Sequence, residues 1–210
     1  EFIKLEKTCP HFHVPLQSGS NRILTAMNRG YSRTDYLRKV ELIKDNLPNS
    51  TFGTDLMVGF PGEKEIDFNE TKEMVREVGF VNTHVFRYSP RESTPASKLD
   101  DKVHSSVKKR RAGELRSLAS RISLEQRRKF EDEKLEMIIE ESSDKIDGWR
   151  GYSKNYIDLH LPEESCRLTE LSPGDTIEVR LTEAKEDICL VTIPDKSPLA
   201  TSGDRVFSGC

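Results

Sequence analysis

Apolar positions in the first 130 residues fall into two alternating patterns. Short apolar runs at residues 11–17, 51–59 and 82–88 are typical of strands that are covered on both faces. Between the runs, a spacing of three and four residues predicts amphipathic helices. The apolar members of two such helices are Tyr36, Val40, Ile43 and Leu47, and Thr71, Met74, Val75 and Val78. This order of strands and helices predicts an α/β fold with a parallel sheet.

Polar residues mark the expected ends of these helices. Ser20 and Ser32 can each cap free backbone amides, and Asp35 follows Ser32 at the spacing of a capping box. Gly30 and Gly79 can supply the left-handed residue that ends a helix. A longer helix is expected over residues 105–130, with Leu115, Leu118, Ala119 and Ile122 on its apolar face.

The pattern changes after residue 133 to short alternating strands separated by polar turns. We expect strands at residues 135–141, 146–152, 156–161, 176–182 and 188–193. Five such strands predict a small OB-like barrel. The expected domains are therefore residues 1–130 and 131–196, followed by a loose tail at 197–210.

Charge separates the two expected domains. Residues 1–130 carry 24 basic and 17 acidic residues, a net +7, whereas residues 131–196 carry 8 and 18, a net -10. The expected helix over 105–130 has a strongly basic face, which is either a solvated charged surface or a surface that follows phosphates. The residues at its start are Lys108, Lys109, Arg110 and Arg111.

The cysteines and the ends of the chain indicate the class of protein but no specific function. No two of Cys9, Cys166, Cys189 and Cys210 are spaced as a metal clip or redox pair, so we expect a reduced cytoplasmic protein without a metal site of its own. Cys9, His11 and His13 share one face of an extended strand, and buried histidines explain them better than a metal does. We expect no membrane segment, no secretory signal, and a fragment of a longer protein.

Three polar turns follow the expected strands, and together they resemble the radical S-adenosylmethionine methylthiotransferases. The runs are Pro15-Leu16-Gln17-Ser18-Gly19-Ser20, Thr54-Asp55-Leu56-Met57-Val58-Gly59-Phe60-Pro61-Gly62-Glu63 and His84-Val85-Phe86-Arg87-Tyr88-Ser89-Pro90-Arg91-Glu92-Ser93-Thr94-Pro95-Ala96. The third run departs from the family pattern Tyr-Ser-x-Arg-x-Gly-Thr-Pro-Ala at Ser93. The resemblance implies the second half of a partial radical SAM barrel followed by a TRAM module.

The resemblance also implies a binding site for S-adenosylmethionine. The residues that match the family motifs are Gln17, Ser18, Thr54, Asp55, Gly59 and Arg91, with Asp55 at a strand end and Arg91 on a carboxylate or phosphate. The family's three-cysteine motif for a 4Fe-4S cluster is absent, and so is its earlier domain with three more cluster cysteines. We therefore expect no catalytic residue in this chain and a missing N-terminal half of the same protein as a partner.

The resemblance further implies tRNA binding through the anticodon arm. The basic residues at the start of the long helix would contact phosphates, and the turn of the small barrel would contribute Arg150, Lys154, Asn155 and Tyr156. The net charge of the small barrel opposes this assignment, and a purely structural role for its tyrosines stays open.

The substrate branch is less sharply indicated. Asp55 disfavours the ribosomal-protein branch, which usually has an aromatic residue there. The run His84-Val85-Phe86 is more similar to the enzymes that act on threonylcarbamoyl-adenosine beside the anticodon. The alternatives are the isopentenyl-adenosine branch and a non-catalytic RNA-binding or partner-docking protein.

Overall fold

The computed structural model describes residues 8–92, 94–166 and 171–194. They form two compact units. The first comprises residues 12–123, and the second comprises the residues from 124 on together with those that precede residue 12. The expectations for Ser93 and for the tail at 197–210 lie outside the described residues.

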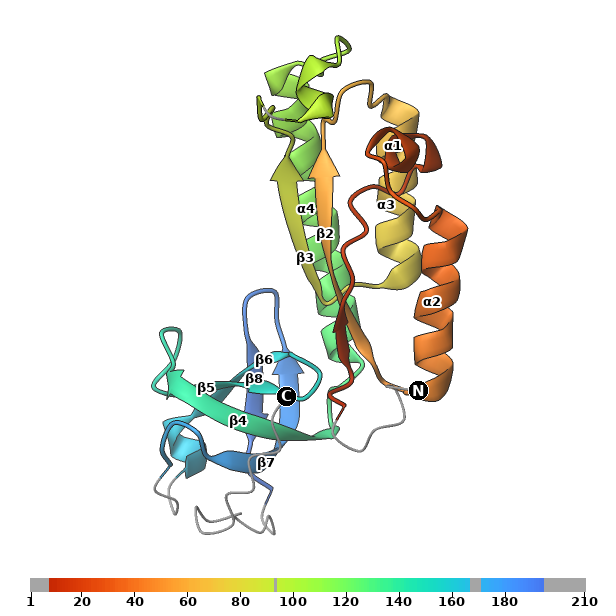
Figure 1. The fold of residues 1–210 in the computed structure, drawn as a ribbon. Coiled ribbons are helices and arrows are strands. Elements are labelled where there is room, and N and C mark those ends of the chain that lie inside the picture. Colours follow the sequence, from red (N-terminus) through yellow and green to blue (C-terminus); the bar gives the residue numbers. More distant parts are fainter. Residues whose placement is uncertain (1–7, 93, 167–170, 195–210) are drawn as a thin grey trace. The chain divides into compact units, whose positions relative to one another are not determined.

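The first unit is an α/β fold built on a three-stranded sheet of order β1-β2-β3, in which β2 and β3 run parallel. This confirms the predicted fold class. Its elements, shown in Figure 1, are β1 (His11–His13), α1 (Asn21–Ala26), α2 (Arg33–Asn46), β2 (Thr51–Val58), α3 (Glu65–Val78), β3 (Asn82–Arg87), the 3-10 helix η2 (Pro95–Lys98) and α4 (Ser105–Arg128). Two of them cross the boundary, because His11 and the residues of α4 from Leu124 on belong to the second unit.

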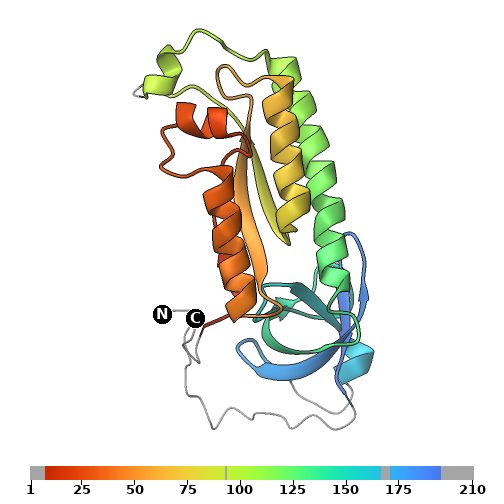
Figure 2. The same cartoon turned by 90° about the vertical axis from the view of Figure 1, so that its right-hand side faces the viewer.

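One face of this sheet carries the core of the unit. Phe52, Leu56 and Val58 point from β2 into that core and are almost fully buried. Helices α2, α3 and α4 cover this face, as Figure 2 shows. No described helix covers the opposite face, which we call the open face. Because successive strand residues alternate between faces, β2 presents Asp55 and Met57 there.

The capping residues explain where two helices begin and end. Ser32 caps α2, with its hydroxyl accepting from the Asp35 amide at 3.2 Å while Asp35 accepts from the Ser32 amide at 3.0 Å. Helix α3 ends at Gly79, whose φ of 74° lies in the left-handed region that glycine adopts without steric cost. Both boundaries confirm the sequence prediction.

Two boundaries differ from the prediction. Helix α1 ends at Ala26, and Asn28, with a φ of 57°, takes the left-handed position predicted for Gly30. Strand β1 stops at His13. The Val14 amide still donates to the Gly53 carbonyl at 2.9 Å, but the next amide on that side, Leu16, donates to the Thr54 hydroxyl and not to the β2 backbone. Pairing resumes only at a parallel bridge between Gln17 and Leu56.

The second unit contains a closed barrel of order β4-β5-β6-β8-β7. Leu135, Met137 and Ile139 alternate along β4 and point into its core. The prediction of a small five-stranded barrel is confirmed, whereas its assignment as a TRAM module stays a prediction. Its elements are β4 (Lys134–Ser142), β5 (Gly148–Ser153), β6 (Asp158–Pro162), the 3-10 helix η3 (Glu163–Cys166), β7 (Thr176–Ala184) and β8 (Cys189–Thr192).

A buried histidine lies in this barrel. The side chain of His160 on β6 is fully buried, its Nδ1 lies 2.7 Å from the Ser143 hydroxyl, and its Nε2 lies 3.5 Å from Asp158. Burial lowers the pKa of His160 below its usual value, against the attraction of Asp158. The folded barrel therefore favours the neutral ring.

This preference predicts that the barrel loses stability in mild acid. As the pH falls from about 7 to about 5, the unfolded chain binds a proton near the ordinary histidine pKa of about 6.5, while the folded barrel resists it. His160→Asn should flatten this dependence. Urea unfolding followed by the fluorescence of Trp149, the single tryptophan of the chain and part of β5, measures it.

The exposed His104 provides the matched control, because His104→Asn removes a histidine that lies before α4, outside the barrel. That variant should keep the wild-type pH dependence of barrel stability, as measured by urea unfolding with Trp149 fluorescence. If the stability of His160→Asn falls with pH as steeply as that of the wild type, the acid sensitivity of the barrel comes from other groups.

Candidate functional site

The three predicted turns lie at the carboxyl ends of β1, β2 and β3, at the top of the first unit in Figure 1. Parallel strands bring such turns to one edge of the sheet, where ligands of α/β proteins bind. The side chains of the turns nevertheless divide between two tasks. Some tie the turns to the helices, and others face the open side of the sheet.

The first turn is fixed to α3. Ser18 is buried and its hydroxyl accepts from the Ser20 amide at 3.2 Å, while the Gly19 amide donates to the Thr71 hydroxyl at 2.9 Å. A Cβ on Gly19 would lie 2.5 Å from the Thr71 Cα, so only glycine fits there. Ser18 therefore holds the turn in place and does not line the open face.

Asp67 on α3 anchors the same turn. Its carboxylate accepts from the Ser20 hydroxyl at 2.8 Å, from the Lys64 amide at 2.7 Å and from the Arg22 guanidinium. Although burial opposes ionisation, the bonds from Arg22, Lys64 and Ser20 lower the pKa of Asp67 overall. Asp67 was not among the residues predicted from the sequence. Its spacing of three residues from Lys64, at the start of a helix, was the available signal.

Thr54 and Asp55 are neighbours that point in opposite directions. Thr54 is buried, and its hydroxyl accepts from the Leu16 amide at 3.0 Å and donates to the Val14 carbonyl at 2.9 Å. It joins β2 to the chain beyond β1 and is not free to contact a ligand. Asp55 faces the open side, with its carboxylate 3.4 Å from His13 Nε2. The predicted strand-end position of Asp55 is wrong, because β2 continues to Val58.

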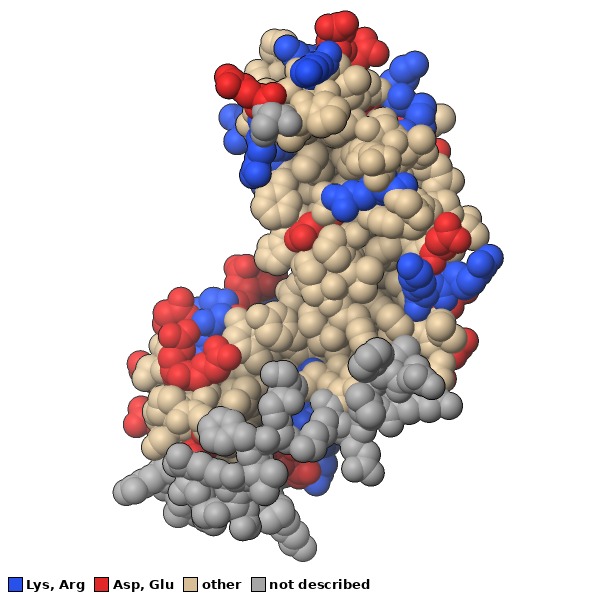
Figure 3. Space-filling model, in the orientation of Figure 1, with Lys and Arg blue, Asp and Glu red and all other residues tan. Residues whose placement is uncertain are grey.

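The open face carries an aromatic and polar row across the three strands. The rings of His13 and His84 lie 5.9 Å apart, and those of His84 and Phe86 are stacked at 6.4 Å. Asp55 is the register partner of His84. Figure 3 looks onto this face, and uncharged side chains dominate the middle of the first unit there. The row gives a ligand both hydrogen-bonding groups and apolar surface.

The second turn is held by a buried ion pair. Gly59, with a φ of 75°, donates its amide to Glu63 at 2.7 Å. Glu63 in turn accepts from Arg111 on α4 at 2.6 Å, and both side chains are at most 5% exposed. Burial raises the pKa of Glu63, against the Gly59 amide and Arg111, which favour the carboxylate.

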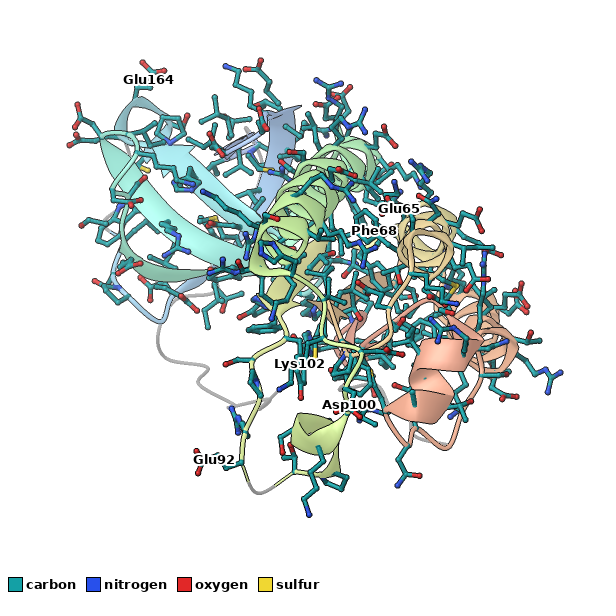
Figure 4. All side chains as sticks on the ribbon, turned by 90° about the horizontal axis from the view of Figure 1, so that it is seen from above. Glu65, Phe68, Glu92, Asp100, Lys102 and Glu164 are labelled. Carbon is teal, nitrogen blue, oxygen red and sulfur yellow. The ribbon has the colours of Figure 1, made fainter. Side chains whose placement is uncertain are left out.

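Arg111 has further contacts on α3. Its guanidinium donates to Glu65 at 3.1 Å and lies 5.5 Å from the ring centre of Phe68. Figure 4 shows Glu65 and Phe68 on the side of α3 toward α4. Arg111 was predicted on a phosphate-binding surface, and Glu63 was given no role. A lone acidic residue in a turn of glycine and proline was the only signal for the pair.

The other basic residues at the start of α4 are also partly engaged. Arg110 pairs with Glu65 at 2.9 Å and with Glu114 at 2.7 Å, and Lys108 donates to the Tyr88 carbonyl at 3.1 Å. Lys109 is exposed. Because their charge is largely matched by nearby carboxylates, Arg110 and Arg111 offer little to a polyanion.

The third turn borders a cavity of about 580 Å³. It brings Gln17, which has a φ of 66°, together with Arg91, and it excludes Ser18, Thr54, Asp55 and Gly59. The cavity residues come from α1 and its following turn, the ends of β2 and β3, and η2. They are Gln17, Ala26, Met27, Asn28, Arg29, Met57, Phe60, Phe86, Arg87, Tyr88, Ser89, Arg91, Thr94, Pro95 and Ala96.

The turn between β5 and β6 forms an aromatic cluster on the barrel. Tyr156 is 52% exposed and has a φ of 58°, and its ring stacks on Tyr152 at 4.8 Å and on His11 at 5.0 Å. Arg150 lies over the Tyr152 ring at 5.3 Å.

The residues predicted to bind RNA at this turn lie in different environments. Arg150 pairs with Asp158 at 2.9 Å and with Glu141 at 2.6 Å, and these bonds raise the pKa of its guanidinium. Lys154 pairs with Glu136, and Asn155 is buried. Lys154 and Tyr156 are thus the exposed members of this turn, with 57% of the Lys154 side chain and 52% of Tyr156 accessible.

Neither a metal centre nor a membrane segment is found in the described part of the chain. No group of three or more His, Cys, Asp or Glu side chains there can hold a metal ion. No helix within residues 8–92, 94–166 and 171–194 is long and apolar enough to cross a membrane.

Comparisons with known proteins agree with the sequence resemblance at family level. Residues 1–75 match the model of the radical SAM superfamily. The chain is 44% identical over 144 residues to the tRNA-2-methylthio-N(6)-dimethylallyladenosine synthase of Pelotomaculum thermopropionicum, covering 69% of this chain and 32% of that protein. A protein of the same name from Desulforamulus reducens is 39% identical over 184 residues, covering 87% and 39%.

A third relative with this name, from Syntrophus aciditrophicus, is 41% identical over 189 residues. These similarities support a place in the methylthiotransferase family. The chain spans between about 30% and 40% of the length of these curated relatives.

The buried ion pair predicts a large effect of one substitution. Arg111→Met leaves the Glu63 carboxylate buried without its partner, and we expect a loss of about 3–5 kcal/mol in the free energy of unfolding of the first unit. Urea unfolding followed by far-UV circular dichroism measures the loss. Arg110→Met, which removes an exposed guanidinium one residue away, should cause a much smaller change. Similar stability of the two variants would contradict a structural role for the pair.

Proposed function

We propose that this chain contributes to a tRNA methylthiotransferase, an enzyme that inserts a methylthio group at C2 of an N6-dimethylallyl-adenosine in tRNA. The observation that carries the proposal is the similarity to enzymes named for this product, up to 44% identity over 144 residues. The α/β unit is consistent with it, because the matching turns meet at one edge of the sheet and border one cavity.

The relatives favour the isopentenyl branch over the threonylcarbamoyl branch expected from the sequence. That expectation depended on a run of three residues in β3, His84-Val85-Phe86. Sequence identity over 144 to 189 residues is stronger support for a substrate branch than three matching residues in one strand. The dimethylallyl product therefore replaces the threonylcarbamoyl product in the proposal.

The cysteines of the described residues do not fit a 4Fe-4S cluster. Cluster ligation requires several thiolates that converge on the iron atoms, and Cys166 and Cys189 are free thiols on separate parts of the barrel. Cys9, the third described cysteine, is disulfide-bonded and offers no thiolate. No catalytic step is therefore assigned to a cluster in this chain. Cluster ligands would have to come from other residues of the enzyme, consistent with relatives that are much longer than this chain.

The residues of the open face fit S-adenosylmethionine, unlike the cysteines, which do not fit a cluster. In this family the bound cofactor supplies a 5'-deoxyadenosyl radical that removes a hydrogen atom from an inert C–H bond. We propose that Asp55 accepts hydrogen bonds from the ribose hydroxyls or the ammonium group, with His13 orienting the carboxylate. Ser18, Thr54 and Gly59 contribute by fixing the turns, as their internal hydrogen bonds imply.

The open face also requires a cover that excludes water. His84 and Phe86 are exposed there, and an uncovered apolar sheet face favours association with another segment. We propose that further strands of the same barrel, from a part of the longer protein that the curated relatives include, cover the His13, Asp55 and His84 part of this face. We propose that tRNA contacts the first unit at Lys109 by charge. On the TRAM-like barrel, we propose a separate contact with the exposed part of Tyr156, whose ring is held by Tyr152 and His11.

A chimera tests this function. The matched segment of the Pelotomaculum thermopropionicum relative is replaced by this chain, and the chimera is expressed in a bacterium that lacks its own enzyme. Mass spectrometry of digested tRNA should show 2-methylthio-N6-dimethylallyladenosine. Asp55→Ala in the chimera should reduce the product strongly, because one charge-assisted hydrogen bond contributes about 1.5–3 kcal/mol to cofactor binding.

The controls separate folding from function. Leu42→Ala changes an exposed side chain on α2, remote from the three turns in the sequence, and should leave the product level unchanged. A folded chimera that makes only the threonylcarbamoyl product would move the chain to the other branch. A folded chimera without any methylthio product would favour a non-catalytic RNA-binding or docking protein.

A further inference from the structure

The cavity beside the third turn combines an apolar floor with a cationic rim. We define the floor as Met27, Met57, Phe60, Phe86 and Tyr88, and the rim as Arg29, Arg87 and Arg91. The volume of about 580 Å³ is in the range of small-molecule sites. The cavity residues include no aspartate and no glutamate.

The floor is fixed by the surrounding structure. Met57 and Phe86 are register partners on β2 and β3, so their side chains lie together on the open face. Phe60 is buried and meets the Tyr88 ring edge-on at 5.3 Å. The Tyr88 amide donates to the Val58 carbonyl at 2.9 Å. These contacts give the floor a defined shape before any ligand binds.

The rim differs from the other basic clusters of this unit. Arg22, Arg33, Arg110 and Arg111 all form ion pairs with carboxylates. Arg29, Arg87 and Arg91 are exposed, and none of them forms an ion pair within the described residues. Their charges are therefore available to a ligand.

The combination selects one class of ligand. A sulfonium or ammonium cation finds no carboxylate among the cavity residues and meets three guanidinium groups that repel it. A nucleotide with a hydrocarbon substituent matches both parts, because guanidinium groups bind phosphates through paired hydrogen bonds and the floor buries apolar carbon.

We infer that the cavity binds and recognises the hydrocarbon substituent of the substrate nucleoside. The floor receives the N6-dimethylallyl group, and the rim holds the phosphates on either side of that nucleoside. This inference rests on the proposed function and deepens it, since it assigns the choice between modified adenosines to Phe86 and Met57. It also moves Arg91 from the S-adenosylmethionine site to the RNA.

Binding of short hairpin RNAs to the 210-residue chain tests the inference. Three anticodon hairpins carry adenosine, N6-dimethylallyladenosine or N6-threonylcarbamoyladenosine at the target position, and fluorescence anisotropy gives the affinities. The chain should prefer the dimethylallyl hairpin over the unmodified one by about tenfold, because part of a five-carbon arm leaves water. It should not prefer the threonylcarbamoyl hairpin.

Variants separate the floor from the rim. Phe86→Ala should remove most of the preference while the affinity for unmodified hairpin stays within about twofold, since Phe86 is 52% exposed and outside the core. Leu42→Ala, another exposed apolar residue, is the matched control. Arg87→Gln and Arg91→Gln should weaken all hairpins alike and lower the log–log salt slope by about one unit each. Arg38→Gln, an exposed arginine of α2, should change neither.

Each failure has its own signature. Equal affinity for the dimethylallyl and unmodified hairpins would overturn the inference, and an active chimera would show that the proposed function survives it. A second result would also overturn the inference. If the chain prefers the threonylcarbamoyl hairpin and Arg91→Gln removes that preference, the rim binds a carboxylate and not a phosphate. A dimethylallyl preference with an inactive, folded chimera would uphold the cavity and refute the proposed function.

Discussion

The ion pair between Glu63 and Arg111 is the interaction on which the arrangement of the first unit depends. Desolvating two charges is costly, so the pair is maintained only while its geometry and its additional hydrogen bonds are intact. Those bonds reach Gly59 in the turn after β2 and Glu65 at the start of α3. A single guanidinium on α4 thereby fixes the direction in which the chain leaves the central strand.

A second buried carboxylate performs the same task for the turn after β1. Asp67 holds Ser20, Arg22 and the Lys64 amide, which links α1 to α3. The two carboxylates lie four residues apart along the chain, one in the turn and one in the first turn of the helix. The edge of the sheet where the three turns meet is therefore positioned by charged groups behind it, and Asp55 on the open face takes no part in these bonds.

Features that depend on nearby residues were predictable from the sequence. The Ser32 and Asp35 capping box lies within four residues, and Gly79 ends α3 through its own backbone freedom, so both boundaries were predicted correctly. Alternating apolar residues such as Leu135 and Met137 were sufficient to predict the barrel strands. The direction of the Thr54 and Asp55 side chains was not predicted, because the apolar run indicated a strand covered on both faces, whereas one face of β2 is open.

Features that depend on distant partners were not predictable. Arg111 looked like one member of a basic stripe because its carboxylate is 48 residues away. Asn28 took the left-handed position predicted for Gly30, since both asparagine and glycine tolerate that conformation and the local sequence does not decide between them.

Strand β2 carries two nearly independent sets of side chains. Phe52, Thr54, Leu56 and Val58 serve the core, while Asp55 and Met57 face the open side. Substitutions in the second set disturb little packing, so a lineage can exchange the ligand of this scaffold by changing alternate residues. The scaffold is in this sense evolvable: selection for a new substrate and selection for a stable core act on different positions of the same strand.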